Sequence, residues 1–382
     1  MMTIEFIREK GLQALKEELS IEIKKYPGFF VLNYNQLDSP VLSPIVQECR
    51  GLILSDDLEV IARGFGRFFN YGETPQVTSA MKYEGAKAYV KHDGSLINLY
   101  YHPITKQWEV ATRNAAYAEG FEKTATLKYK QLVCIALGFD TKEQTTDAEF
   151  SSKVATANLD KDFCYLFELT SPMNRDVRPY KDYRMWLLGA VHKQTGEEIL
   201  FEELRGLVLD KLAEQKLVGY LPDYETLENE DHLKRLLAKG GNQLEEGYVV
   251  HNEKQGLRVK AKFPGYLAAK HIRAPDGNHI PQRIATLVVT GEHVEWLSYN
   301  QKDEEIFAPY VAARERLKSE MISIQEEIDS ISEQKELAQR IKHLVYSGII
   351  FKARKANCSI WEMFLSEDTK QQAKIVVQAK NK

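Results

Sequence analysis

The stretch Lys91-His92-Asp93-Gly94 follows the apolar run Ala88-Tyr89-Val90 and is the most informative part of the chain. A lysine attacks phosphorus only as the neutral amine, so a nucleophilic lysine needs surroundings that disfavour its charged form. Asp93 comes two residues later and would share a face with Lys91 along a strand. Gly94 then allows a turn, or the close approach of a ligand to the backbone. A surface hairpin would show the same four residues, so the interpretation depends on the segments around them.

Composition limits the classes of protein that the chain can represent. With 382 residues and 43% hydrophobic content, the chain can form two domains with real cores. The net charge of -4 means that any nucleic-acid surface must be a local patch. The four cysteines form no CxxC pair, which favours a reducing compartment and argues against a zinc site. The charged N-terminus does not read as a signal peptide, and no apolar run approaches about 18 residues, so we expect an intracellular protein without a membrane span.

Short β runs surround the Lys91 stretch on both sides. A helix is predicted over residues 3–25, followed by strands at 29–34, 51–54 and 60–63. Three further strands, at 87–91, 95–101 and 108–112, predict a meander that places Lys91 beside a strand turn. Residues 117–137 are predicted to be helical, and residues 138–160 read as a polar connection.

The β pattern resumes after residue 160 and gives way to helices after about residue 268. Strands are predicted at 163–169 and 185–192, helices at about 201–216 and 223–239, and a hairpin at 247–251 and 257–263. In the last part of the chain, apolar residues step by 4, 3, 4 and 3 and predict one helix stripe: Leu317, Met321, Ile324, Ile328 and Ile331. The run 345–351 could supply its partners.

The strand 258–263 alternates cations with apolar residues. Arg258, Lys260 and Lys262 therefore share one face, and the apolar residues between them share the other. A solvated strand face is one interpretation. Three like charges on one face repel each other, however, unless an anion lies among them. A triphosphate would satisfy such a face.

Two carboxylates stand inside or beside predicted strands. Glu168 interrupts the apolar run 163–169, so it needs a partner, a hydroxyl donor or a metal, or else it faces the open side of a half-buried strand. Glu246 stands at the mouth of the 247–251 strand, and oxygen ligands of this kind suit Mg²⁺. The segment 171–180 reads as an irregular loop with polar and cationic groups suited to nucleotide or phosphate contacts.

Upstream of Lys91, two segments add cations and aromatic residues. Glu48-Cys49-Arg50-Gly51 leads into a strand, and residues 64–71 combine Arg67 with several aromatic side chains that could serve either the core or binding. Other nucleotide and hydrolase signatures are missing from the sequence, which has no GxxxxGK[ST] loop, no GxGxxG after a first strand, no GxSxG and no HExxH.

Taken in order, KHDG at 91–94, FELTSP at 167–172, EEGYVV at 245–250 and RVKAKF at 258–263 resemble the covalent nucleotidyltransferases, which include polynucleotide ligases and mRNA capping enzymes. ECRG at 48–51, RFFN at 67–70 and PMNRDVRPY at 172–180 resemble the bacteriophage tRNA-repair RNA ligase family, of the RNA ligase 1 type. The resemblance covers about residues 29–268. It implies an α+β fold: an antiparallel-sheet nucleotidyltransferase domain of the ATP-grasp-like ligase kind at 1–268, followed by a mainly α-helical domain at 269–382.

The resemblance also implies roles for individual residues. Lys91 would be the nucleophile that becomes lysyl-AMP, Lys260 and Lys262 would contact the α-phosphate and assist the chemistry, and Glu246 would help to bind the metal. The remaining positions would bind the nucleotide, with Glu168 on the ribose and the arginines on phosphates; they are Arg50, Arg67, Phe69, Asp93, Gly94, Arg113, Glu168 and Glu246. The family usually has lysine where this chain has Arg67 and Arg113.

The implied reaction uses ATP and Mg²⁺, with Mn²⁺ as an alternative ion. AMP would pass from Lys91 to a 5′-phosphate on RNA, and a 3′-hydroxyl would displace it. The implied partners are single-stranded RNA ends, for example of tRNA, and an end-processing kinase or phosphatase; a monomer in the cytoplasm of a phage-infected cell is expected. Two alternatives stay open: a capping-type guanylyltransferase, which GTP would label, and a nucleotide- or RNA-binding module without catalysis. DNA ligases and capping enzymes carry a β-barrel after the last lysine motif, whereas residues 269–382 read mostly as helix.

Overall fold

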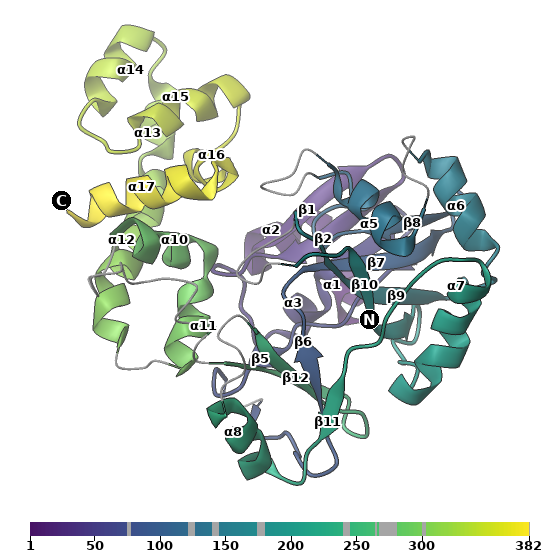
Figure 1. Cartoon of the computed structure of the whole chain (residues 1–382). Coiled ribbons are helices and arrows are strands. Elements are labelled where there is room, and N and C mark those ends of the chain that lie inside the picture. Colours follow the sequence, from purple (N-terminus) through teal and green to yellow (C-terminus); the bar gives the residue numbers. More distant parts are fainter. Residues whose placement is uncertain are drawn as a thin grey trace. The chain divides into compact units, whose positions relative to one another are not determined.

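The computed structural model describes residues 1–74, 78–120, 127–139, 145–173, 180–239, 245–263, 266, 281–299 and 303–381. The chain divides into two compact units, Met1–Ala269 and Lys270–Lys382. Figure 1 shows strands and helices mixed in the first unit, and helices in the second. The α+β class predicted from the sequence is confirmed.

Three β-sheets form the first unit, and the described strand pairs are antiparallel apart from β13 with β5. The first sheet runs in the order β1 (Ile21–Tyr26), β2 (Phe29–Tyr34), β3 (Arg50–Ser55) and β4 (Val60–Ala62). The second sheet runs in the order β10 (Arg184–His192), β9 (Phe163–Thr170), β7 (Ser95–His102) and β8 (Gln107–Ala111). The third sheet runs in the order β11 (Tyr224–Thr226), β6 (Lys87–Lys91), β12 (Gly247–Asn252), β13 (Leu257–Lys262) and β5 (Phe69–Asn70).

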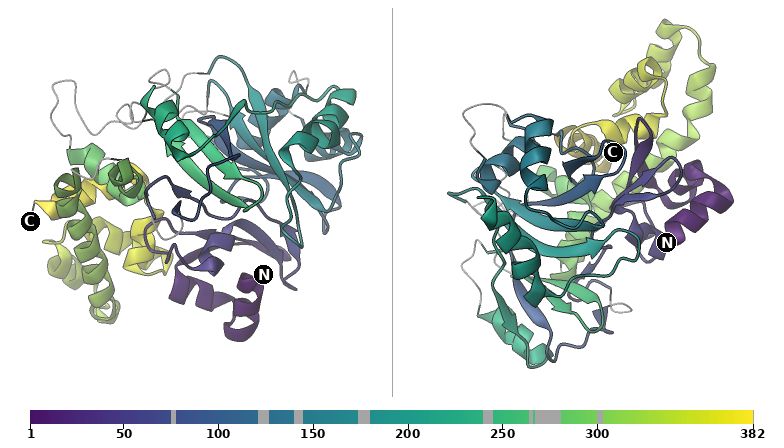
Figure 2. Two further views of the ribbon diagram at one scale, coloured as in Figure 1. Left: turned by 90° about the horizontal axis from the view of Figure 1, so that it is seen from below. Right: turned by 90° about the vertical axis from the view of Figure 1, so that its right-hand side faces the viewer.

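Each sheet has helices packed against it. The first sheet contacts α1 (Met2–Lys10), α2 (Leu12–Leu19) and α3 (Pro44–Glu48), which Figure 2 shows in purple beside the first strands. The second contacts α5 (Tyr129–Leu137), α6 (Asp147–Ala155) and a helical segment made of η1 (Phe201–Glu203), η2 (Arg205–Leu209) and α7 (Asp210–Glu214). The third contacts α8 (Glu230–Ala238).

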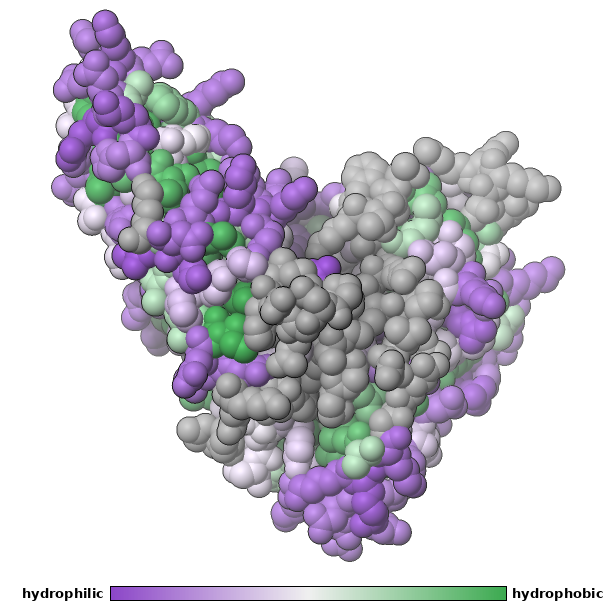
Figure 3. Space-filling model, turned by 60° about the vertical axis from the view of Figure 1, so that its left-hand side comes forward, coloured by the Kyte–Doolittle hydropathy of each residue, from purple (hydrophilic) through white to green (hydrophobic). Residues whose placement is uncertain are grey.

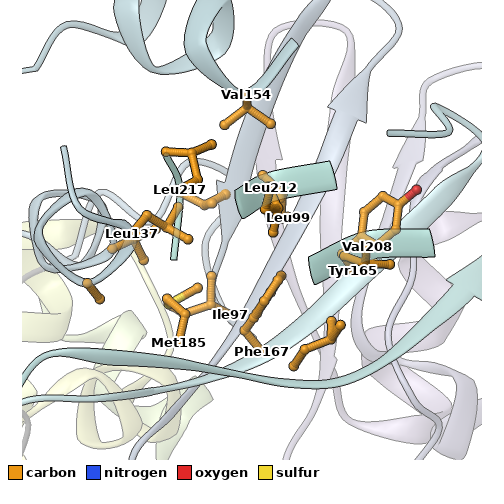
Figure 4. Close-up of a cluster of buried hydrophobic side chains, with 14 of the residues drawn as sticks. Ile97, Leu99, Leu137, Val154, Tyr165, Phe167, Met185, Val208, Leu212 and Leu217 are labelled. Atoms are coloured by element: carbon orange, nitrogen blue, oxygen red, sulfur yellow. The ribbon is translucent and has the colours of Figure 1, made fainter. Parts of the chain in front are cut away.

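The second sheet is covered on both faces, because alternate residues of its strands point in opposite directions. Figure 4 shows one face, where Ile97 and Phe167 join apolar side chains from the helices. Tyr100 and Cys164 point the other way and pack against Phe29 of the first sheet. The second sheet therefore lies between the first sheet and the helices α5, α6 and α7. Packing on both faces holds its strands in place, and with them the side chains at the strand ends.

Several predicted boundaries were wrong. The expected helix over residues 3–25 breaks at Gly11, which has a φ of 88°, and ends at Ser20 in the left-handed conformation, after which residues 21–26 form β1. The predicted helix over 117–137 begins only at Tyr129, and residues 121–126 lie outside the described part. Helix α6 stands within the expected polar connection, where Thr146 and Glu149 form a capping box. The predicted helix over 223–239 contains β11 before α8.

The predicted meander is confirmed for the strands at 95–101 and 108–112, which pair as β7 and β8, and is wrong for the strand that carries Lys91. Strand β6 pairs with β11 and β12 in the third sheet, whereas β7 pairs with β8 and β9 in the second. The chain therefore crosses from one sheet to another at residues 92–94. A Cβ atom on Gly94 would lie 2.2 Å from the carbonyl oxygen of Leu169, so glycine is needed here for close backbone packing against β9.

The described part of the second unit consists of helices and their connections, as predicted. They are α10 (Pro281–Thr290), α11 (Glu292–Tyr299), α12 (Glu304–Ser323), α13 (Gln325–Ser330), α14 (Gln334–Ile341), α15 (Ser347–Ala356), α16 (Ile360–Ser366) and α17 (Thr369–Lys380). The expected single stripe spans two helices, because α12 ends before Ile324 and α13 begins after it. Leu317, Met321 and Ile328 are buried, and α12 packs on α10, α16 and α17.

The surface of the second unit seen at the upper left of Figure 3 is mostly hydrophilic. None of the helices in the described residues is both long enough and apolar enough to cross a membrane.

Candidate active site

A cavity of about 290 Å³ lies between the second and third sheets. Lys91 lines it from β6, and Lys260 and Lys262 line it from β13. Glu168 of β9 and Leu96 of β7 line it from the second sheet. The Lys91 stretch, the Glu168 strand and the cationic strand, which are far apart in the sequence, therefore meet around one space.

Glu246 joins two of the lysines in this cavity. Its Oε2 atom accepts a hydrogen bond from Nζ of Lys91 at 2.6 Å, and its Oε1 atom lies 2.7 Å from Nζ of Lys262. Both lysines stand opposite Gly247 in the β-sheet register, because β12 pairs with β6 on one side and with β13 on the other. A Cβ atom on Gly247 would lie 2.2 Å from the carbonyl oxygen of Ala261, so glycine lets the chain pass closely here. The register thus brings one carboxylate between two ammonium groups.

Glu168 faces the cavity. It is therefore a buried carboxylate with a partner, and not a residue on the open side of a half-buried strand. Its Oε1 atom accepts a hydrogen bond from the backbone N–H of Gly94 at 3.0 Å. Burial raises the pKa of Glu168 to about 7, and the negative charges of Glu246 and Asp93 act in the same direction. Lys91 and the Gly94 amide oppose this shift in the pKa. The carboxyl can therefore change its charge near neutral pH.

The predicted register of β13 is confirmed. Val259, Ala261 and Phe263 are 3%, 0% and 4% exposed. Arg258, Lys260 and Lys262 line the cavity. Alternation along the strand thus separates packing residues from cavity residues.

Carboxylates of the protein itself supply anions among these three cations, where the sequence suggested a triphosphate. Arg258 forms a two-pronged ion pair with Glu198, in which Nη1 and Oε1 lie 2.8 Å apart. Lys262 pairs with Glu246. Lys260 Nζ lies 5.1 Å from the centre of the Phe68 ring, which also lines the cavity. Carboxylates from distant segments and an aromatic ring thus offset the positive charge of this face of the strand.

Asp93 is buried behind the cavity wall. Its Oδ1 atom accepts a hydrogen bond from the Tyr266 hydroxyl at 2.9 Å, and its backbone N–H donates to the Tyr180 hydroxyl at 2.9 Å. His92 and Gly94, on either side of it, line the cavity. Asp93 therefore ties the crossover between the two sheets to two tyrosines. The predicted loop at 174–179 lies outside the described residues.

Three arginines predicted to bind nucleotide gather around Tyr34. The Cζ atoms of Arg67 and Arg113 lie 4.6 Å and 5.8 Å from the centre of its ring. Arg50 lines the cavity, and burial lowers its pKa, while Tyr34 acts in the opposite direction. Sequence reasoning missed Tyr34, although its place at the end of β2, beside the strand that carries Arg50, was a usable signal.

Arg67 and Phe69 are not among the residues that line this cavity. Nη2 of Arg67 lies 3.7 Å from Oε1 of Glu73, and its Cζ lies 5.4 Å from the centre of the Phe69 ring. Phe69 is 2% exposed. Their predicted nucleotide contacts stay predictions.

Sequence reasoning also missed a stack of two rings beside Lys91. The ring of His92 lies 3.7 Å from the ring of Trp186, at an angle of 12°. Trp186 is fixed in turn by a hydrogen bond of 3.0 Å from its indole N–H to the Thr170 hydroxyl. No local pattern pairs these residues, because the stack joins segments about a hundred positions apart.

The carboxylates of the cavity suit a hard cation that keeps other ligands. Glu246 lies at the wall with its two oxygens paired to Lys91 and Lys262, so it would bind a cation only after a lysine moves away, and Glu168 lies close enough for the two carboxylate charges to interact. Among the described residues, no group of three or more His, Cys, Asp or Glu side chains could hold a metal ion by itself. Mg²⁺ usually takes one or two protein carboxylates and completes its shell with phosphates and water, which fits this arrangement.

The RNA ligase family model matches residues 48–266, more than half of the chain. The chain belongs to this family. The resemblance to the phage-type RNA ligases is thereby confirmed. An RNA ligase of Rhodothermus phage RM378 is 24% identical over 330 residues, which cover 73% of each chain.

A putative bifunctional polynucleotide kinase/RNA ligase of Autographa californica nuclear polyhedrosis virus is 30% identical over 359 residues, which cover 91% of this chain and 48% of the viral protein. A putative RNA ligase of Thermovibrio ammonificans is 26% identical over 280 residues, which cover 70% of this chain and 65% of that protein. The chain thus spans about half of the viral relative and less than two thirds of the bacterial one.

Solved structures give weaker matches. A putative ATP-dependent DNA ligase from Aquifex aeolicus has a TM-score of 0.46 at 13% identity and covers 80% of this chain and 72% of its own. An RNA ligase of Naegleria gruberi with ATP and Mn has a TM-score of 0.37 at 16% identity and covers 51% and 54%.

Proposed function

We propose that the protein is an ATP-dependent RNA ligase that joins 3′-hydroxyl and 5′-phosphate ends of RNA through lysyl-AMP and RNA-adenylate. The observation that carries this proposal is the position of Lys91, with Glu246 and Lys262 bonded together at the wall of a cavity in the family-matched region. A lysine amine, two flanking cations and two carboxylates are the groups that adenylyl transfer needs.

Three displacements at phosphorus make up the proposed reaction. The unprotonated Nζ of Lys91 attacks the α-phosphorus of ATP and forms a P–N bond. Pyrophosphate leaves with the electron pair of the broken P–O bond, and the nitrogen gives up one proton to solvent. A 5′-phosphate oxygen of RNA then attacks the same phosphorus, and the amine of Lys91 leaves and regains a proton. Finally, an RNA 3′-hydroxyl attacks the 5′-phosphorus, loses its proton and displaces AMP.

The residues of the cavity have different roles in the proposed reaction. Lys260, Lys262 and Arg50 offset the negative charge that builds up on the phosphate oxygens. Glu168 holds the ribose. Glu246 helps to hold Mg²⁺ or Mn²⁺, which when bound neutralises phosphate charge. Asp93 and Gly94 fix the chain on which Lys91 stands.

The remaining predicted roles belong to the same proposal. Arg67 and Arg113 serve the nucleotide's phosphates from the cluster around Tyr34, and Phe69, beside Arg67, belongs to the nucleotide site. Residues 1–268 carry out adenylyl transfer, and the helices of residues 269–382 steer RNA. We infer an RNA-repair role on ends such as those of cleaved tRNA, acting as a monomer. An end-processing kinase or phosphatase would prepare the ends, and the name of the viral relative combines a polynucleotide kinase with an RNA ligase.

Labelling by nucleotide tests the proposal. The protein is incubated with α-labelled ATP and Mg²⁺, and the covalent label is measured beside Lys91→Ala. Lys87→Ala is the matched control, because Lys87 stands on the same strand and lies outside the cavity lining. We expect label in the wild type and in the control, and none in Lys91→Ala. Label from GTP instead of ATP would point to a capping-type enzyme, and RNA binding without any label would point to a binding module.

A further inference from the structure

The cavity of Lys91 changes in character along its length. Lys91 and Lys262 stand at one end, where both lie opposite Gly247 in the β-sheet register. Two residues farther along β12, Val249 lines the cavity with an apolar side chain. Ligand pockets usually combine an apolar lining with a few polar groups that fix the ligand's orientation. The lysine end thus suits phosphates, and the apolar end suits the flat ring of a base.

Tyr89 stands at the apolar end. It precedes Lys91 by two residues on β6, so both side chains point to the same face of the strand, and Tyr89 lines the cavity. A strand rises about 3.3 Å per residue, which places Tyr89 roughly 7 Å from Lys91 along β6. Its ring lies 4.5 Å from the ring of Phe201, and Val249 stands opposite it in the register. A ribose bridges a distance of this order, so the base of an adenylate on Lys91 would lie beside Tyr89.

The hydroxyl of Tyr89 has no hydrogen-bond partner among the described residues, and its oxygen is buried. The whole residue is only 8% exposed. Buried polar groups are nearly always hydrogen-bonded, and a buried tyrosine hydroxyl usually finds a partner, because a hydrogen bond that is lost to water and not replaced is costly. A ligand in the cavity can supply the missing partner.

The charges around this hydroxyl favour a ligand group that carries hydrogens. Burial raises the pKa of Tyr89, and the negative charges of Glu253 and Glu202 act in the same direction, while Arg258 opposes them. Glu253 also lines the cavity. An ionised carboxylate only accepts hydrogen bonds, so a donor group is favoured near it. The 6-amino group of adenine is such a donor, whereas the 6-oxygen of guanine only accepts.

His251 adds a second polar group beyond Tyr89 without adding charge. It lines the cavity and stands opposite Lys87, one step farther from Lys91 in the register. Burial lowers the pKa of His251 to about 3, and the charges of Arg258 and Lys87 act in the same direction. The imidazole is therefore neutral near pH 7 and does not repel or attract a base by charge.

We propose that Tyr89 determines which base the protein accepts, with its hydroxyl accepting a hydrogen bond from the 6-amino group of adenine. Tyr89 is then a specificity-determining residue, which separates adenine nucleotides from purine nucleotides without this amino group. This inference rests on the proposed ATP-dependent ligase function.

Tyr89→Phe tests the proposal, because it removes the hydroxyl and keeps the ring. Tyr224→Phe is the matched control: its ring lies 5.4 Å from that of Tyr89, but Tyr224 is 45% exposed and outside the cavity lining. Both changes are made in Lys91→Ala, so that nucleotide binds without reacting. Titration calorimetry then gives the dissociation constants of ATP and of purine riboside 5′-triphosphate, which lacks the 6-amino group. Thermal unfolding without nucleotide compares the folds.

We expect Lys91→Ala alone to bind ATP at least about fivefold more tightly than the analogue, a factor of the size that one neutral hydrogen bond gives. Adding Tyr89→Phe should bring the two dissociation constants within about twofold, because ATP binding weakens and analogue binding does not. Tyr224→Phe should keep the preference. Since the Tyr89 hydroxyl has no partner among the described residues, Tyr89→Phe should unfold at a temperature no lower than its parent.

Equal binding of ATP and the analogue by Lys91→Ala alone would overturn the proposal without any change at Tyr89. So would a Tyr89→Phe protein that keeps the preference, or one that weakens both nucleotides equally, because the hydroxyl would then serve the fold. A wild type that forms no covalent adduct with labelled ATP would contradict the ligase function itself, so the two failures are distinguishable.

Discussion

Nζ of Lys91 and Oε2 of Glu246 lie 2.6 Å apart, although the two residues are 155 positions apart in the chain. Glu246 also pairs with Lys262, so one carboxylate joins a half-buried and a buried ammonium group. In the proposed reaction, Lys91 must lose its proton and leave this ion pair before it can attack.

Removing the Glu246 carboxylate should leave the repulsion between Lys91 and Lys262 without compensation. We expect Glu246→Ala to lower the free energy of unfolding by roughly 3–5 kcal/mol, because it leaves two lysines without a shared counter-charge. Urea denaturation measures this loss. Glu18→Ala, which breaks an exposed ion pair with Lys10, is the control and should cost less. Equal losses would show that the Glu246 pairs contribute no more than a surface pair.

Substitutions at Lys260 in β13 and at Phe263 directly after it should have different effects. Phe263→Ala should lower the free energy of unfolding by roughly 3–5 kcal/mol, because Phe263 is buried beside Tyr248. Lys260→Ala should leave stability nearly unchanged and reduce lysyl-AMP formation at least tenfold, because Lys260 faces the cavity. Denaturation curves and labelling with ATP are measured on both variants. A loss of stability in Lys260→Ala together with a loss of labelling in Phe263→Ala would contradict this division.

Glu168 should make stability depend on pH. Its pKa is raised to about 7 in the folded protein, from a value of 4.5, so the folded state binds this proton more tightly than the unfolded chain does. The resulting stabilisation is complete below the unfolded pKa and is lost as the pH rises through about 7. Between about pH 5 and about pH 8, the wild type should therefore lose stability relative to Glu168→Gln. Parallel curves for the two proteins would show that the carboxyl does not titrate in this range.

The crossover after Lys91 should not tolerate a side chain at Gly94. Gly94→Ala places a Cβ atom 2.2 Å from the Leu169 carbonyl oxygen and should cost about 3 kcal/mol or more, or prevent folding. Gly206→Ala is the matched control, because a Cβ atom there meets nothing within 4 Å. Thermal unfolding of the two variants compares them. A Gly94→Ala protein as stable as the control would show that the sheets can separate at this point.

The second unit should be dispensable for the first chemical step. A chain ending at residue 269 keeps Lys91, Glu246 and Tyr266, whose hydroxyl binds Asp93. We expect this chain to form lysyl-AMP nearly as well as the full chain and to join RNA poorly. Circular dichroism must show that it is folded. A folded truncation that cannot be labelled would assign part of the ATP site to the second unit.

The sequence predicted those features that depend on neighbours in the chain. The alternation of cations and apolar residues placed Lys260 and Lys262 on the cavity face of β13, because successive side chains of a strand point to opposite faces. The pairing of β6 with β12 was not predictable, because it joins segments that are remote in the chain, and adjacency wrongly favoured a hairpin between β6 and β7. For the same reason, the carboxylates that face Arg258 and Lys262 could not be assigned before the sheets were seen.

The chain crosses from the third sheet to the second at residues 92–94, and residues of both sheets line the cavity. Lys91, Lys260 and Lys262 belong to the third sheet, and Glu246 adjoins it, whereas Glu168 belongs to the second. A change of angle between these sheets would alter the distance from Glu168 to Lys91, while Lys91, Lys260 and Lys262 would keep their places in one sheet. Residues His92 to Gly94 are the covalent link between β6 and β7 across this boundary.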